Sequence, residues 1–142
     1  MLTVNAYLNF NGNTEEAFNF YKSVFGGEFT MMQKFKDTPE GAKVPAAEAD
    51  KILHISLPVG KNGHLMASDY VPSMGIPPFV SGNNFSLSIN AESRAEGDQI
   101  FKNLSKGGNV TMPMQDTFWG SYFGMLVDKF AIQWMISVEG KQ

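Results

Sequence analysis

The sequence has 142 residues and 43% of them are apolar, which is enough for one domain with a sizeable core. Eleven Lys and Arg against fourteen Asp and Glu give a net charge of −3, which argues against a nucleic-acid-binding surface or a polybasic membrane contact. No apolar run approaches the roughly 20 residues of a membrane span, and no secretory signal opens the chain. The sequence has no cysteine, which excludes disulfides and zinc–thiolate sites, so we expect a cytoplasmic protein.

The first half predicts one helix and four strands. A short strand at 7–10 precedes a helix whose start has the capping-box pattern of Asn13 and Glu16, and whose end is marked by Gly26 and Gly27. Further strands are predicted at 29–31, 52–59 and 64–71. Residues 36–51 are polar and lack periodicity, so we expect a mobile loop there.

The second half repeats this order. A strand at 87–90 precedes a helix that begins with Ser93 and Glu96 and stops at Gly107 and Gly108. Strands are predicted at 110–112, 119–128 and 130–138. The two helix starts lie 80 residues apart, which favours a duplication of one βαβββ module.

The predicted fold class is therefore α+β, with two tandem βαβββ modules in a single domain. Module one spans about 1–71, a linker about 72–83 and module two about 84–142. One helix covers only one face of a four-stranded sheet, so the other face must be covered by something else. We expect two curved mixed sheets around a concave pocket, because ligands favour such junctions.

Several segments resemble the vicinal oxygen chelate superfamily, which includes glyoxalase I, bleomycin-resistance proteins and extradiol dioxygenases, and more narrowly its PhnB-like branch. The residues that carry the resemblance are Ala6–Phe10, Glu16–Tyr21, Val24–Glu28, Ile52–His54, Met66–Asp69, Met112, Gln115–Gly120, Asp128–Phe130 and Gln133–Ile136. The resemblance implies a glyoxalase/bleomycin-resistance fold and a homodimer.

Metal-using members of the superfamily place one ligand on the first and last strand of each half. The matching positions here are Ala6, Asp69, Met135 and either Ser86 or Ser88. At most one of these is a strong donor, whereas a first-row divalent metal needs about three. We therefore predict no metal site and no cofactor. The alternative is a divalent-metal-dependent lyase, isomerase or dioxygenase of the glyoxalase type, in which His54 and Asp69 converge on an ion with Gln115 or Gln133.

Two groups of residues are candidates for the site. His54 and Asp69 are candidate catalytic residues, because an imidazole and a carboxylate in contact would form an acid–base couple. Each also has a structural interpretation. His54 could be a sheet histidine whose ring is hydrogen-bonded to a neighbouring group, and Asp69 could be a strand-end aspartate that caps a turn. The candidate ligand-binding residues are Tyr7, His54, Asp69, Gln115, Trp119, Tyr122, Gln133 and Met135. Aromatic and methionine side chains among them also fit ordinary core packing.

The leading functional hypothesis is a protein that binds a small organic ligand in an aromatic- and Met-lined pocket. Whether it also catalyses a reaction is open, and a purely structural dimer is a third possibility. The nucleotide-binding glycine loop between strand and helix is missing, so the methyltransferase label sometimes attached to the PhnB-like branch has no support in the motifs.

Overall fold

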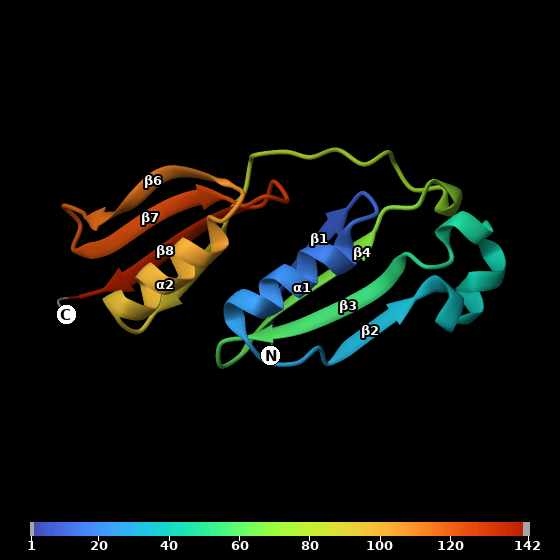
Figure 1. Ribbon diagram of the computed structural model, residues 1–142, viewed down its shortest axis with the longest axis horizontal. Coiled ribbons are helices and arrows are strands. Elements are labelled where there is room, and N and C mark those ends of the chain that lie inside the picture. The colour runs from blue at the N-terminus through green and yellow to red at the C-terminus, as the bar shows by residue number, and fades with distance from the viewer. Residues whose placement is uncertain (1, 141–142) are drawn as a thin grey trace. The chain divides into compact units, whose positions relative to one another are not determined.

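The computed structural model describes residues 2–140, and the chain divides into two compact units, Met1–Val80 and Ser81–Gln142. Each unit contains a four-stranded mixed sheet and one α-helix. Figure 1 shows the helix of each unit beside the strands of its sheet. The predicted α+β class is confirmed. In the described part of the chain, no helix combines the length and the apolar character that a membrane crossing requires.

The first unit follows the order strand, helix, strand, strand, strand. Its elements are β1 (Ala6–Phe10), α1 (Thr14–Phe25), β2 (Met31–Lys34), β3 (Ile52–Val59) and β4 (Gly63–Asp69). The strands lie in the order β1-β4-β3-β2, with β1 parallel to β4 and the other neighbours antiparallel. Helix α1 lies across one face of this sheet (Figure 1).

The second unit has the same topology. Its elements are β5 (Leu87–Ala91), α2 (Arg94–Leu104), β6 (Asn109–Asp116), β7 (Ser121–Val127) and β8 (Gln133–Glu139). The order is β5-β8-β7-β6, again with one parallel pair, β5 and β8. The repeated βαβββ module predicted from the two helix starts is thus confirmed.

Alternation along each strand places apolar side chains under the helix. In the first unit Leu8 and Phe10 of β1 and Phe18 and Tyr21 of α1 are buried, and the ring of Phe10 packs edge-on against that of Phe18. In the second unit Trp134 is fully buried and its indole Nε1 donates a hydrogen bond to Asp128 Oδ2 at 2.8 Å. Trp134 and Ile136 of β8 thus belong to the core of the second unit.

The start of α1 differs from the expected capping box. Asn13 makes no side-chain capping bond. Instead Asp69 Oδ1 accepts hydrogen bonds from the backbone N–H of Thr14 at 3.0 Å and from its hydroxyl at 2.6 Å. The carboxylate of Asp69, at the end of β4, thus accepts the hydrogen bond from the first turn that an N-cap side chain accepts in other helices. In α2 the expected cap is present, because Ser93 Oγ accepts from the N–H of Glu96 at 3.1 Å.

Two predicted boundaries shift where side chains organise turns. Strand β8 begins at Gln133 rather than at 130, because Asp128 Oδ1 accepts from the N–H groups of Phe130 and Ile132 and holds a turn. The segment 36–51, expected as a mobile loop, is largely taken up by three short 3-10 helices, the first of which begins at the buried Phe35.

Candidate functional site

The side of each sheet that faces away from its helix carries most of the predicted ligand residues. We call it the helix-free face of the first or the second sheet. Pairing between strands defines its members, because residues directly opposite each other in a ladder point to the same side. Each face is described within its own unit.

The helix-free face of the first sheet carries an aromatic–imidazole pair. The hydroxyl of Tyr7 on β1 lies 3.2 Å from Nδ1 of His54 on β3. The two rings are stacked, with centroids 5.6 Å apart and planes inclined by 29°. Because β4 lies between β1 and β3, the tyrosine reaches across one strand to make this contact. Tyr7 remains 46% exposed, so the pair is open to an incoming molecule.

The neighbours of this pair are polar but uncharged. Asn9, Ser68, His54 and Gln33 stand in one row across the four strands of the first sheet. The next row contains Tyr7, Met66, Ser56 and Met31. Ser68 Oγ donates a hydrogen bond to Asn9 Oδ1 at 3.4 Å. The imidazole of His54 makes no hydrogen bond other than the one to Tyr7 among the described residues. The face therefore offers amide, hydroxyl and imidazole groups beside two thioethers.

Asp69 lies on the opposite side of the same sheet. It is 5% exposed, and its Oδ2 accepts the N–H of Ile52 at 2.8 Å while its Oδ1 caps α1. Its two carboxylate oxygens are thus taken up by backbone and hydroxyl donors. The structure does not bring Asp69 and His54 together, so it shows no acid–base couple between them.

The helix-free face of the second sheet is richer in thioether and aromatic groups. Met112, Met125 and Met135 stand in one row across three neighbouring strands. Gln115 and Phe123 form the next row with Ser137. Met135 and Gln115 were among the predicted ligand residues. Ser137 donates to Glu139 Oε1 at 3.0 Å, which places one carboxylate at the end of this face.

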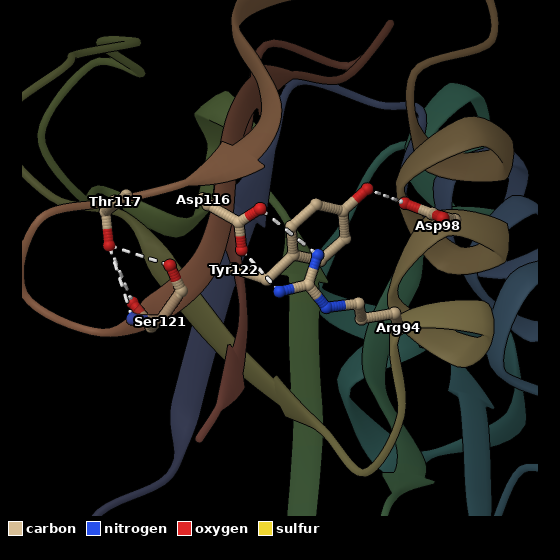
Figure 2. A network of polar contacts seen from close by, with 6 residues as sticks. All are labelled: Arg94, Asp98, Asp116, Thr117, Ser121 and Tyr122. Atoms are coloured by element: carbon tan, nitrogen blue, oxygen red, sulfur yellow. Dashed lines mark hydrogen bonds and ion pairs between the residues drawn. The ribbon is translucent and has the colours of Figure 1, made fainter. Parts of the chain in front are cut away.

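Trp119 reaches this face from the β6–β7 hairpin. Its ring packs edge-on against Phe123 with centroids 5.7 Å apart. The hairpin is closed by Thr117, whose Oγ1 donates to the carbonyl of Ser121 at 2.7 Å (Figure 2). Phe118 at the tip is 98% exposed and Trp119 is 55% exposed. The tip thus presents two aromatic rings on an anchored turn.

A concavity of about 550 Å³ opens at the other end of the second sheet, a volume in the usual range of ligand pockets. It is lined by Ser81, Gly82, Asn83, Val127, Ala131 and Gln133. Gln133 was predicted to bind ligand, and its side-chain amide here donates a hydrogen bond to the carbonyl of Phe85. The amide therefore fixes the chain at the rim of the concavity.

Tyr122 lies on the helix side of the second sheet. Its hydroxyl donates to Asp98 Oδ1 at 2.7 Å, and the guanidinium of Arg94 lies 4.4 Å from the centre of its ring (Figure 2). Arg94 also forms an ion pair with Asp116. The hydrogen bond to Asp98 is the main cause that raises the pKa of Tyr122. This network joins α2 to β6 and β7 and lies apart from the helix-free face.

The donor set of these faces does not fit the metal that the resemblance implies. The first face carries two imidazoles, His54 and His64, and the second carries the carboxylate of Glu139. Across residues 2–140, no three His, Asp or Glu side chains gather closely enough to hold an ion. A divalent first-row metal takes about three such ligands from the protein, and the described residues of these faces do not supply them together.

Sequence reasoning missed several members of the two faces. Asn9, Gln33 and Ser68 on the first face and Phe123 and Glu139 on the second were not among the predicted site residues. Strict alternation from Tyr7 gives Asn9. Gln33 needs the register of β2 against β3, which is shifted by an irregularity beside Lys34 and has no signal in the sequence.

Comparisons with known proteins agree with this architecture. A family model described as 3-demethylubiquinone-9 3-methyltransferase matches residues 3–137. Protein YjdN of Escherichia coli K12 is 30% identical over 99% of this chain and 98% of its own. The crystal structure of protein PA1353 from Pseudomonas aeruginosa is 40% identical, covers 99% of this chain and 100% of its own, and has a TM-score of 0.86.

More distant structures share the fold. A PhnB protein from Bacillus cereus, titled a putative 3-demethylubiquinone-9 3-methyltransferase, is 24% identical over 96% of this chain and 99% of its own, with a TM-score of 0.75. A glyoxalase/bleomycin resistance protein/dioxygenase family enzyme from Burkholderia phytofirmans PsJN is 18% identical over 95% and 98%, with a TM-score of 0.63. The chain therefore belongs to the PhnB-like 3-demethylubiquinone-9 3-methyltransferase family and has the glyoxalase/bleomycin-resistance fold.

Proposed function

We propose that this protein binds a small organic molecule on the helix-free faces of its sheets, and that it does so without a metal ion or other cofactor. The observation that carries the proposal is the Tyr7–His54 pair, which is stacked, hydrogen-bonded and exposed on a sheet face whose two rows around the pair contain no charged residue. Side chains that only filled a core would be apolar and buried.

The second sheet supports the same proposal by a different route. Three methionines in one row supply soft apolar surface that adapts to differently shaped ligands. Trp119 adds an exposed aromatic ring that packs against Phe123 of the neighbouring row, and aromatic rings favour stacking with planar ligands. A ligand with a planar apolar body and a few hydrogen-bonding atoms matches both surfaces.

The methyltransferase name of the family model is not part of the proposal. Methyl transfer from a nucleotide-derived donor needs a site for that donor, and in doubly wound folds a glycine-rich turn between strand and helix provides it. In the described residues, Gly12 is the only glycine of the turn between β1 and α1. Its carbonyl accepts a hydrogen bond from Lys51 at 3.1 Å.

A ligand screen with matched variants tests the binding function. Aromatic and heterocyclic compounds are added to the purified protein, and the melting temperature is recorded. A ligand at 100 times its Kd stabilises the folded state by about 2.7 kcal/mol, which corresponds to a shift of several degrees. We expect the shift of a hit to be lost in Tyr7→Ala and His54→Ala and kept in Asn19→Ala, which changes an exposed residue of α1.

Two results would contradict the proposal. One is the absence of any shift across a chemically broad set of aromatic compounds. The other is a stoichiometric Zn²⁺, Ni²⁺ or Fe²⁺ ion in protein purified without chelator, with ligand shifts that disappear when the ion is removed. The second result would favour the metal-dependent lyase, isomerase or dioxygenase alternative.

We further propose that the protein acts in the cytoplasm as a homodimer. The exposed apolar side chains of edge strand β2, Met31 and Met32, support self-association, since an uncovered sheet edge is a template for pairing. Light scattering coupled to size exclusion decides the oligomeric state: a dimer mass supports the proposal and a monomer mass at micromolar concentration contradicts it.

A further inference from the structure

The contact between Tyr7 and His54 has a chemical property that most histidine contacts lack. A backbone carbonyl can accept only from a protonated ring nitrogen, and a backbone N–H can donate only to an unprotonated one. A phenolic hydroxyl can do either. The hydroxyl of Tyr7, 3.2 Å from Nδ1, therefore remains a partner for His54 whether the imidazole is neutral or protonated.

One of the two tautomers that this contact allows suits a ligand with a hydroxyl group. When Nδ1–H donates to the oxygen of Tyr7, the other nitrogen, Nε2, is an acceptor. No hydrogen bond of Nε2 is found among the described residues. A ligand O–H can then donate to Nε2, and the Nδ1–H bond to Tyr7 persists if the proton moves across.

The two rows that hold the pair contain no carboxylate and no second imidazole that would compete for the proton. The residues that face His54 on the neighbouring strands are Ser68 and Met66 of β4, Asn9 of β1 and Gln33 of β2. The remaining titratable group of this face, His64, lies at the β3–β4 turn. Two nearby ammonium groups are engaged elsewhere: Lys34 pairs with Glu15 of α1 at 3.7 Å, and Lys51 donates to the carbonyl of Gly12.

We infer that this face takes a planar aromatic ligand with a weakly acidic hydroxyl, a phenol or an enol, and binds it with transfer of the hydroxyl proton to His54. In this step the O–H bond of the ligand breaks and an N–H bond forms at Nε2, so that a phenolate or enolate lies against an imidazolium. The inference rests on the proposed function, because it names the ligand class of the same site.

Charge balance favours a weak acid over a permanent anion. A ligand that is already a carboxylate or phosphate in solution needs a standing positive charge, and the first face holds no Lys or Arg in its rows. A phenol is neutral in solution and ionises only beside the imidazole. The phenolate and the imidazolium then lie next to each other, so neither of these charges is left unpaired on the face.

A pair of coloured probes tests the proton transfer directly. Para-nitrophenol absorbs visible light only when it is ionised, and para-nitroanisole has the same ring with a methyl group in place of the proton. Both are titrated into the protein at a pH at which free para-nitrophenol is mostly neutral. We expect bound para-nitrophenol to turn yellow and to bind about tenfold more tightly than para-nitroanisole, as for one charge-assisted hydrogen bond.

Variants separate proton transfer from stacking. His54→Asn should abolish the colour and the preference for para-nitrophenol, and Tyr7→Phe should keep the binding of para-nitroanisole but weaken the ionisation severalfold. Asn19→Ala should change neither. Equal binding of both probes without colour overturns the inference and leaves the proposed ligand function standing. If neither probe binds, the inference fails, and binding of any other aromatic compound in the ligand screen then decides the proposed function separately.

Discussion

Asp69 connects three elements of the first unit through one carboxylate. It lies at the end of β4, caps the first turn of α1 through Thr14 and accepts the N–H of Ile52 at the start of β3. The sequence offered both a catalytic and a turn-capping interpretation of this residue. Alternation along β4 could assign its side, but its partners lie 55 and 17 residues away, and no local pattern identifies contacts of that range.

Replacing Asp69 tests how much this connection contributes to stability. In Asp69→Asn one acceptor oxygen remains, and the new NH2 group meets a backbone N–H, so at least one buried donor loses its partner. We expect a loss of about 1–3 kcal/mol in the free energy of unfolding, measured by denaturant titration. Asp50→Asn, an exposed carboxylate paired with Lys36, is the control and should change stability by less than about 0.5 kcal/mol. Equal effects of the two variants would contradict the account.

Tyr122 was predicted to bind ligand and instead belongs to a network on the helix side. Its pKa is raised, first by the hydrogen bond to Asp98, then by burial and by the negative charge of Asp98. The aromatic character of residues 118–134 was evident in the sequence. The side on which each ring lies depends on where β7 begins, and that boundary was predicted two residues too early.

Removal of the acceptor should lower this pKa. We expect Asp98→Asn to shift the ionisation of Tyr122 downward in an absorbance titration of tyrosinate. Because the folded-state pKa lies above the unfolded value, the network stabilises the fold below about pH 10, and this contribution is lost as the pH rises through the raised value. Tyr122→Phe should therefore flatten the alkaline loss of stability. An unchanged titration in Asp98→Asn would show that the hydrogen bond is not the main cause.

Helix α2 approaches its sheet closely because glycine occupies the contact. A Cβ at Gly124 of β7 would lie 2.7 Å from Met114 Sδ and 2.8 Å from Phe101 Cε2, both shorter than normal contacts. The helix itself was predictable from its cap and its apolar periodicity. The close neighbours of Gly124, by contrast, include a ring of α2 and a side chain of β6, which only the structure shows.

Filling this contact should loosen the packing of α2. Gly124→Ala must displace the ring of Phe101 or the side chain of Met114, and overpacking of this kind costs about 1–3 kcal/mol. The melting temperature should fall by several degrees. Gly82→Ala is the matched control, because its Cβ would meet only Asn84 Oδ1 at 3.9 Å. A melting temperature of Gly124→Ala equal to that of the control would contradict the packing argument.

The molecule as a whole repeats one module with different side chains on the helix-free faces. By register, Tyr7 corresponds to Ser88, His54 to Phe123 and Gln33 to Gln115, while Met66 corresponds to Met135. Duplication was predictable because caps and turn glycines recur at a fixed offset. The divergence of the two faces was not, because it requires the cross-strand register, which shifts at irregularities in the β2–β3 and β6–β7 ladders.

The central claim is that ligands bind on the helix-free faces, and carbon-13 labelling of the methionine methyl groups tests it within one spectrum. Met31, Met66, Met112, Met125 and Met135 lie on these faces, whereas Met114 packs beside Phe101 on the helix side. On addition of a stabilising aromatic ligand, we expect methyl shifts at face methionines and none at Met114. Shifts at Met114 with unchanged face methionines would contradict the account.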